Sequence, residues 1–327
     1  MTGLAALHAE ATTRAAGTGR MTSRSWVQRA ETALRDLPEG ARLGMRRDVP
    51  LAGRTYIGVG GPAAIYLAPE DAEVLGRALL RLSEQDVPFD YLGAGSNLIV
   101  ADSGPSFVVV SSERLGAEPR LEGDQVYAGA GYSVPRLVQR LQKAGLTGLE
   151  FAEGIPGTVG GATRMNAGWH EGEFGRAVVS LFTVTRAGTV EEIAAGPDTF
   201  AYRRSPGVGE RFVAGATLRL VPDDPARIAE RMRGYRDHRV RSQPAGERNA
   251  GCMFKNPSGD HAGRLIEVSG LKGMTIGRAQ VSDLHANFFI NLGGATFTDV
   301  AALMDAVRDA VLRATSVTLE PEVVLWT

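Results

Sequence analysis

Short apolar runs and helical stripes alternate along the first hundred residues of the chain. Apolar runs over residues 65–67 and 89–92 predict two strands, and a helix between them opens near Asp71. Three leucines fall on one face of that helix: Leu75, Leu79 and Leu82. A further run over residues 107–110 adds a strand. The pattern therefore predicts a β-α-β unit from about residue 64.

The next hundred residues begin in the same way and then become rich in strands. A strand over residues 126–131 leads into a helix with Ser133 as its N-cap and Gly145 at its end. Leu137 and Leu141 form the buried stripe of this helix. Strands dominate again over residues 178–193, with Ala187-Gly188 as the turn between them.

The pattern changes after Leu220. Pro222 and Pro225 interrupt the strands, and a charged helical stretch follows over residues 228–241, so we expect a domain boundary at this point. A third region extends to about residue 315 and includes an amphipathic helix. The inward face of that helix consists of Val300, Leu303, Met304, Val307 and Val311. Residues 317–326 again have strand composition.

Composition limits the class of protein. A chain of 327 residues with 43% hydrophobic and 22% charged residues is typical of a globular protein with two or three packed units. Its 36 basic and 37 acidic side chains nearly cancel, which disfavours a nucleic-acid or membrane-surface partner. No apolar run approaches the roughly 18–20 residues that span a bilayer. Any anion-binding site must therefore come from a local cluster of donors and not from the net charge of the chain.

Cysteine usage and the N-terminus indicate a cytoplasmic protein. The single cysteine, Cys252, excludes an internal disulfide, and no cysteine/histidine cluster has the spacing of a zinc site, so no metal is expected. Residues 1–24 are predicted to be a disordered tail, and the first twenty lack the apolar centre of a secretory signal. Met1 and Met21 both remain possible starts of translation.

Glycine is the unusual component, with 41 residues that gather in clusters. The loop Gly93-Ala94-Gly95-Ser96-Asn97 follows a strand but fails as a Rossmann fingerprint, because the third glycine position is Leu98 and a β-prone segment follows. A structural turn explains this loop equally well when it is taken alone. A second loop over residues 153–161, continued by residues 164–168, suits a backbone held against a flat ligand or its diphosphate. Two such loops together suggest one extended cofactor.

Three segments resemble a known family in order and spacing. RTYIGVGGPA (residues 54–63), YLGAGSNLIVAD (91–102) and EGIPGTVGGATRMNAG (153–168) are similar to the FAD-binding domain of the UDP-N-acetylenolpyruvoylglucosamine reductases, called MurB. This domain belongs to the vanillyl-alcohol-oxidase class of flavoproteins. The resemblance implies an α+β fold with two FAD-binding subdomains and a smaller α/β substrate-binding domain. The implied cofactor-binding residues are Gly93, Ala94, Gly95, Ser96, Asn97, Gly154, Ile155, Pro156, Gly157, Thr158 and Gly160.

The resemblance also implies how the chain is divided. Residues 25–110 form the first FAD-binding subdomain and are joined by the C-terminal residues 316–327. Residues 111–220 form the second subdomain, and residues 221–315 form the substrate-binding domain. The chain length of 327 residues and the short path from Asn256 to Gln280 resemble the compact (type II-like) variety of the family. We expect a monomer.

Further segments select the reaction, although each has an ordinary structural explanation. Residues 200–205 read as a polar loop, Cys252 as a small buried hydrophobe, Glu320 and Glu322 as surface acids, and His285 as a core histidine. They nevertheless resemble the family's YR-x-S, AGS-x-FKNP, LEPEV and AQVS-x-x-HANF motifs, with cysteine where many members have serine. The resemblance implies that Arg203 is catalytic, Cys252 donates a proton and Glu322 is the catalytic glutamate. Implied substrate contacts are Tyr202, Lys255, Asn256 and His285.

The implied reaction uses FAD as cofactor and NADPH as co-substrate. NADPH reduces FAD and leaves, and UDP-N-acetylglucosamine enolpyruvate then accepts hydride at its enolpyruvyl group. Arg203 suits the carboxylate of that group because a guanidinium stays charged and makes two parallel hydrogen bonds. The substrate diphosphate needs cations of its own, and the candidates are Arg239, Arg241 and Lys255, although a basic run on a helix is as often a solvated face.

Two other functions fit part of this pattern. An FAD-dependent alcohol or sugar oxidase of the same fold would also need the two glycine loops. A non-catalytic protein that binds a nucleotide sugar would retain them in degenerate form. Reoxidation by oxygen identifies the oxidase, and a purified protein that stays colourless with added FAD identifies the binding protein.

Overall fold

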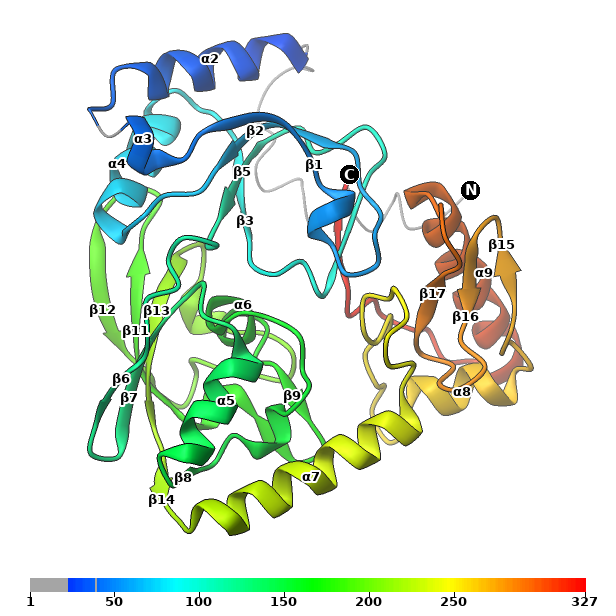
Figure 1. Ribbon diagram of the computed structural model, residues 1–327. Coiled ribbons are helices and arrows are strands. Elements are labelled where there is room, and N and C mark those ends of the chain that lie inside the picture. The colour runs from blue at the N-terminus through cyan, green and yellow to red at the C-terminus, as the bar shows by residue number, and fades with distance from the viewer. Residues whose placement is uncertain (1–22, 39) are drawn as a thin grey trace.

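The structure, a computed structural model, describes residues 23–38 and 40–327, which form three packed units (Figure 1). Among these residues no helix combines the length and the apolar character needed to cross a membrane. The α-helices are α2 Ser23–Arg35, α3 Gly40–Leu43, α4 Ala72–Glu84, α5 Val134–Lys143, α6 Val159–Arg164, α7 Pro225–Ser242, α8 Ala262–Val268 and α9 Phe297–Thr315. Short 3-10 turns are η1 Ala52–Arg54, η2 Glu150–Ala152, η3 Phe174–Arg176 and η4 Pro206–Val208.

The first unit is built on a four-stranded sheet with the order β1-β2-β5-β3. Its strands are β1 Arg46–Pro50, β2 Pro62–Leu67, β3 Phe89–Leu92 and β5 Val108–Ser111. Strands β2, β5 and β3 are parallel, and β1 is antiparallel to β2. Helix α4 connects β2 to β3 and begins at Asp71, whose carboxylate accepts a hydrogen bond from the Val74 N–H at 2.8 Å. The predicted β-α-β unit is present, with β5 inserted between its two strands.

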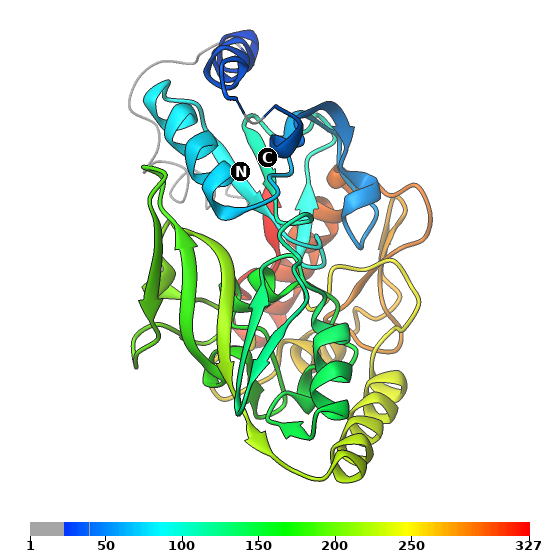
Figure 2. The same ribbon diagram turned by 60° about the vertical axis from the view of Figure 1, so that its left-hand side comes forward.

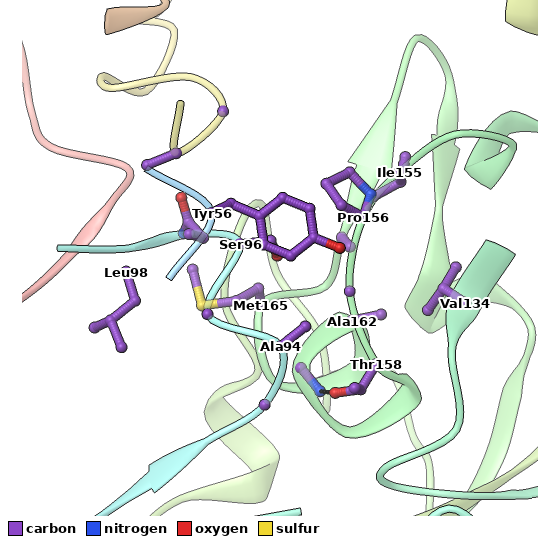
Figure 3. A pocket seen from close by; sticks show the side chains of 18 of the residues that line it. Tyr56, Ala94, Ser96, Leu98, Val134, Ile155, Pro156, Thr158, Ala162 and Met165 are labelled. Carbon is purple, nitrogen blue, oxygen red and sulfur yellow. Dashed lines mark hydrogen bonds between the residues drawn. The ribbon is translucent and has the colours of Figure 1, made fainter. Parts of the chain in front are cut away.

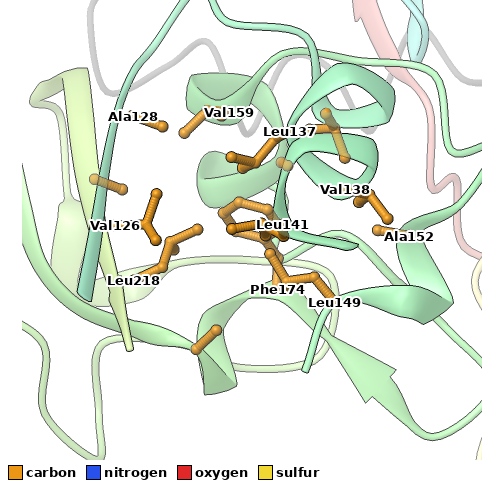
Figure 4. Close-up of a cluster of buried hydrophobic side chains, with 14 of the residues drawn as sticks. Val126, Ala128, Leu137, Val138, Leu141, Leu149, Ala152, Val159, Phe174 and Leu218 are labelled. Atoms are coloured by element: carbon orange, nitrogen blue, oxygen red, sulfur yellow. The ribbon is translucent and has the colours of Figure 1, made fainter. Parts of the chain in front are cut away.

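The second unit is a five-stranded antiparallel sheet with the order β12-β11-β13-β7-β6. Its strands are β6 Arg120–Glu122, β7 Gln125–Gly129, β11 Val178–Val184, β12 Val190–Ala194 and β13 Phe212–Arg219. Helix α5 packs Leu137 and Leu141 into the core of this unit, as its periodicity predicts (Figure 4). Ser133 precedes α5 as expected, but its side chain makes no capping hydrogen bond. Small pairs complete the unit: β8 Leu146–Thr147 with β14 Val221–Pro222, and β9 Gly168–Trp169 with β10 Gly172–Glu173.

The first two units share a hydrophobic core. Val184, Phe212 and Ala214 of the second sheet are buried in one cluster with the leucines of α4. The close approach depends on Gly76 of α4, because a Cβ atom there would lie 2.4 Å from the Gly188 carbonyl oxygen in the β11–β12 turn. The two units therefore meet along a tight backbone contact.

The third unit packs two helices against a small antiparallel sheet. The sheet contains β15 Thr275–Ile276, β16 Ala279–Val281 and β17 Phe289–Asn291. Helix α9 buries the five residues that its amphipathic pattern predicts. The chain then returns to the first unit, where β18 Val324–Trp326 pairs in parallel with β4 Leu98–Val100 (Figure 2). Residues 317–326 were expected to form a strand, and only the last three of them do so, as β18.

Helix α7 runs from the second unit towards the third (Figure 1). Its buried residues Ile228 and Met232 belong to the core of the second unit, with Tyr235 packed against them. The predicted domain boundary after Leu220 stays a prediction, although this packing associates α7 with the unit before it. Of the predicted N-terminal tail, residues 1–22 lie outside the described residues, and residues 23 and 24 begin α2.

Candidate functional site

A cleft of about 920 Å³ lies between the two glycine loops (Figure 3). This volume is within the range of small-molecule and cofactor sites. All of the residues predicted to hold the cofactor line the cleft: Gly93, Ala94, Gly95, Ser96, Asn97, Gly154, Ile155, Pro156, Gly157, Thr158 and Gly160. The predicted catalytic residues Arg203, Cys252 and Glu322 also line it. Segments that are far apart in the sequence therefore meet at one cavity.

The two glycine loops need their glycines for different reasons. Gly95 has a φ of +67°, and a Cβ atom there would lie 2.0 Å from the Arg54 carbonyl oxygen. Gly157 has a φ of +152°, and its nearest neighbour would be the Ser96 hydroxyl oxygen at 3.7 Å. The first glycine is required by backbone packing, and the second keeps the space between the loops open.

Backbone donors are left available in both loops. Within residues 23–38 and 40–327, the N–H groups of Ala94, Gly95 and Ser96 donate no hydrogen bond, and neither do those of Gly157 and Thr158. Backbone N–H groups that point into a concave loop bind phosphate oxygens well. The donor set therefore fits a diphosphate between the loops.

The second glycine loop contains a helix that the sequence did not predict. Helix α6 begins at Thr158, whose hydroxyl accepts a hydrogen bond from the Gly161 N–H at 3.4 Å. Two glycines disfavour a helix at this position. Tertiary packing explains it, since a Cβ atom on Gly160 would lie 2.9 Å from the Ala130 Cβ. The expected continuous loop thus ends at Thr158.

Arg203 and Glu322 form an ion pair in the wall of the cleft, close enough to Cys252 for their charges to act on it. The Arg203 Nε donates to the Glu322 Oε1 at 2.9 Å, and the two side chains are 18% and 16% exposed. By contrast, the Glu320 side chain is 75% exposed, so the structure separates the two acids of the LEPEV segment. Arg203 has a φ of +56°, an uncommon conformation for a residue with a side chain.

Burial dominates the titration of this centre. It raises the pKa of the Glu322 carboxyl, and the Arg203 charge opposes that shift. It also raises the pKa of the Cys252 thiol to about 12, with a further contribution from the Glu322 charge. The charges of Arg203 and Arg239 act in the opposite direction on the thiol. The thiol therefore keeps its proton at neutral pH, which suits a proton donor.

Asn287 fixes the backbone next to the thiol. Its amide nitrogen donates to the Phe254 carbonyl at 2.8 Å, and its amide oxygen accepts from the Phe254 N–H at 3.0 Å. The side chain is 2% exposed. Residues 285–287 predicted a functional role for His285. In the structure, the contact with the segment that carries Cys252 comes from Asn287, two residues later.

The four predicted substrate residues lie outside the wall of the cleft. Tyr202 is half-exposed beside it, with its ring centroid 4.9 Å from the Arg203 guanidinium carbon. Lys255 pairs with Glu320 at 3.5 Å. The Asn256 amide oxygen accepts a hydrogen bond from the Ala262 N–H at 3.0 Å, at the start of α8. Their roles stay predictions.

His285 is engaged locally rather than directed into the cleft. Its Nδ1 accepts a hydrogen bond from the Asn287 N–H at 3.2 Å, and its ring packs edge-on against Phe288. Burial lowers the pKa of its imidazole. The structure gives no contact that supports the predicted substrate role of this residue.

Several residues of the cleft could not be predicted from the sequence, or were predicted only as one of several candidates. Tyr56 is one of them, and its side chain is among those that line the cleft (Figure 3). The Asp90 Oδ2 accepts a hydrogen bond from the Trp326 Nε1 at 3.1 Å. Burial raises the pKa of the Asp90 carboxyl. Trp169 and Arg239 also line the cleft. A signal for Arg239 was present, because it continues the stripe of Ile228, Met232 and Tyr235 at helical spacing.

The chain is similar to known proteins over most of its length. Residues 63–194 match the model of an FAD binding domain, and residues 243–326 match that of the C-terminal domain of UDP-N-acetylenolpyruvoylglucosamine reductase. The chain is 46% identical over 282 residues to the UDP-N-acetylenolpyruvoylglucosamine reductase of Geobacter metallireducens, covering 85% of this chain and 92% of that protein. Identity to the reductase of Bacillus subtilis is 39% over 283 residues, covering 84% and 91%.

A solved structure is similar over the same extent. The crystal structure of UDP-N-acetylenolpyruvylglucosamine reductase (MurB) from Thermus caldophilus matches with a TM-score of 0.75 and 37% identity. The match covers 86% of this chain and all of that one, 100%.

Proposed function

Because this chain belongs to the family of UDP-N-acetylenolpyruvoylglucosamine reductases, we propose that Arg203, Cys252 and Glu322 form the reacting centre of such an enzyme. The protein is an FAD-containing oxidoreductase of peptidoglycan synthesis. It converts UDP-N-acetylglucosamine enolpyruvate to UDP-N-acetylmuramate with electrons from NADPH. The alternative of an alcohol or sugar oxidase has no support from these relatives.

The observation that carries the proposal is the meeting of the three residues beside the glycine loops. The loops supply free backbone donors for the FAD diphosphate, and the three side chains line the same cleft. When bound, FAD supplies the hydride that no side chain can provide. The residues of the chain then have to bind the substrate carboxylate, hold it in place and deliver a proton.

Arg203 is proposed to bind the substrate carboxylate. Its Nε is occupied by Glu322, so the two terminal nitrogens remain for a pair of parallel hydrogen bonds. Hydride addition leaves negative charge that spreads into this carboxylate, and a fixed cation stabilises that charge better in the transition state than in the substrate. Glu322 in turn fixes the guanidinium, so it acts on the reaction at least through Arg203.

Cys252 is proposed to donate the proton that completes the reduction. The thiol is protonated at neutral pH because burial raises its pKa to about 12. Asn287 holds the backbone of the neighbouring residues, which fixes the direction of transfer. Tyr202, Lys255, Asn256 and His285 remain proposed substrate contacts. We also propose a monomer that works in the cytoplasm.

One experiment tests the proposed function. The purified enzyme is reduced with NADPH without oxygen, and UDP-N-acetylglucosamine enolpyruvate is then added while the flavin absorbance is recorded. We expect rapid return of the oxidised band in the wild type. In Cys252→Ala, reduction by NADPH should stay near normal, while reoxidation by the substrate slows by about 100-fold or more. Wild-type reoxidation in this variant would remove Cys252 from the mechanism.

A further inference from the structure

Asn97 joins the first glycine loop to the C-terminal segment that carries Glu322. Its side-chain Nδ2 donates a hydrogen bond to the Glu322 carbonyl oxygen at 3.0 Å. Its own carbonyl oxygen accepts one from the Val324 N–H at 2.9 Å. Asn97 lines the cleft, as predicted for a cofactor residue, but its amide nitrogen is bound to the chain at Glu322.

The side chain of Asn97 replaces one step of the β4–β18 ladder. In this parallel pair the Val324 N–H donates to the Asn97 carbonyl, and the Ala101 N–H donates to the Trp326 carbonyl. The next step towards the start of the ladder would join the Asn97 N–H to the Glu322 carbonyl. Among the residues that the structure describes, this backbone bond is not made, and the Asn97 amide group supplies the donor instead. The contact with Glu322 is therefore not a by-product of strand pairing.

Glu322 is also held by the other two units. Its N–H donates to the carbonyl oxygen of Met253 at 2.9 Å, and Met253 follows Cys252 in the chain of the third unit. Its carboxylate Oε1 accepts from the Arg203 Nε of the second unit at 2.9 Å. Glu322 is thus hydrogen-bonded to all three units, and its side-chain partner in the first unit is Asn97.

We propose that Asn97 is a positioning residue for the reaction, whose amide holds Glu322 against the cofactor loop and so places the Arg203–Glu322 pair relative to FAD. The inference rests on the proposed function, in which this pair binds the substrate carboxylate. Reaction rates depend steeply on such placement, because a shift of about 1 Å can cost about 100-fold. Asn97 acts through Glu322 and is not itself a reacting group.

A second asparagine makes a similar contact away from the cleft and provides the matched control. The Asn291 Nδ2 donates to the Ile57 carbonyl oxygen at 2.8 Å, which also joins the third unit to the first. Asn291 does not line the cleft. Its Oδ1 accepts from the N–H groups of Gly293 and Ala295, and a carboxylate at this position would keep both bonds. Asn291→Asp therefore removes a donor between units without touching the reacting centre.

The test compares the two half-reactions in FAD-loaded wild type, Asn97→Ala, Asn97→Asp and the control Asn291→Asp. Stopped-flow absorbance follows reduction of the flavin by NADPH without oxygen, and then its reoxidation by saturating UDP-N-acetylglucosamine enolpyruvate. We expect reoxidation in Asn97→Ala to slow by about tenfold to 100-fold, while reduction by NADPH stays near the wild-type rate. In Asn291→Asp both half-reactions should stay near the wild-type rates, even where urea unfolding shows a loss of stability.

Asn97→Asp adds a measurement that a purely structural role would not change. The new carboxyl faces the Glu322 carbonyl oxygen, and only its protonated form carries a donor. A carboxylate facing a carbonyl oxygen is disfavoured, which raises the pKa of the new carboxyl. The ratio of variant to wild-type reoxidation rates should therefore rise as the pH falls from about 8 to about 5, because protonation restores the hydrogen bond. In Asn97→Ala this ratio should stay constant.

Wild-type reoxidation in Asn97→Ala would overturn the inference, and equal slowing in Asn291→Asp would overturn it too, since general destabilisation would then explain both. If Asn97→Ala does not fold, a ratio in Asn97→Asp that does not change with pH has the same meaning. Glu322→Gln separates this inference from the proposed function. Wild-type reoxidation in that variant would contradict the proposed reacting centre, whereas slow reoxidation there beside normal Asn97 variants would overturn only the positioning role.

Discussion

Arg203 and Glu322 are 119 positions apart in the chain and join through a 2.9 Å hydrogen bond between Nε and Oε1. Arg203 lies between β12 and β13 of the second unit, and Glu322 precedes β18, which pairs with β4 of the first unit. The ion pair therefore forms only when the C-terminal segment has returned across the cleft. The proposed reacting centre is complete only when the units are assembled.

Replacing Arg203 by glutamine should impair the oxidative half of the reaction. The change removes the cation that we propose to bind the substrate carboxylate, and it leaves the buried Glu322 without its partner. We expect reoxidation of the reduced enzyme by the enolpyruvyl substrate to slow by about 100-fold to 1,000-fold, the range for loss of a preorganised donor. Stopped-flow absorbance measures it, and the exposed neighbour variant Arg204→Gln serves as the control. Equal rates in both variants would contradict the assignment.

The Cys252 thiol should show the chemistry of a protonated group well above neutral pH. Burial raises its pKa to about 12, so raising the pH through the ordinary thiol pKa of about 8.5 ionises an unfolded chain but not the folded site. At pH 8.5 we expect alkylation by iodoacetamide to be slower in the FAD-loaded enzyme than in the urea-unfolded protein by a factor on the order of 1,000. Timed mass spectrometry measures the difference.

The same shift determines the pH profile of the reaction. A proton donor with a pKa near 12 keeps its proton as the pH rises, so substrate-dependent reoxidation should show no loss with a midpoint near 8.5. Cys252→Ser should have the same flat profile over this range, because a hydroxyl also stays protonated. A wild-type decline at that midpoint which disappears in the serine variant would contradict the raised pKa.

Gly157→Ala should weaken FAD binding more than it weakens the fold. The φ of +152° disfavours any side chain, and the added methyl group would project between the loops towards Ser96. We expect the FAD dissociation constant to rise by about tenfold or more. The matched control is Gly123→Ala, in the β6–β7 turn, where φ is +64° and no atom lies within 4 Å of the added Cβ. Flavin fluorescence during dialysis compares the two variants.

Much of the fold was predictable because burial repeats with the period of each element. The stripes of α4 and α9 are buried as predicted, and the segment after Asn97 forms β4 rather than the helix of a Rossmann turn. Helix α6 was not predictable from local preference, since it contains two glycines, and one of them, Gly160, packs closely against Ala130, a residue distant in sequence. Local hydrophobic patterns therefore predict most helices and strands, and an element such as α6 depends on contacts with residues far away in the sequence.

The site was predictable to the extent that motifs fix backbone position. All of the predicted cofactor residues and the three predicted catalytic residues line the cleft. A motif does not specify where a side chain points, and His285 turns to the Asn287 N–H instead. Arg239 and Arg241 were equivalent candidates by charge, yet they are two residues apart on a helix and so face different directions. The apolar stripe that Arg239 continues is the feature that separates them.

The N-terminus of α9 should contribute measurably to the stability of the third unit. The Thr296 hydroxyl accepts a hydrogen bond from the Asp299 N–H at 3.1 Å, and the Asp299 carboxylate accepts one from the Thr296 N–H, also at 3.1 Å. Thr296→Ala removes the first of these bonds and should lower the free energy of unfolding by about 1 kcal/mol. Urea unfolding at saturating FAD measures the change. Thr298→Ala is the control, since this exposed side chain makes no capping hydrogen bond among the described residues. Because α9 does not line the cleft, FAD affinity should stay at the wild-type value, and a matching loss of affinity would show that the cap acts through the site.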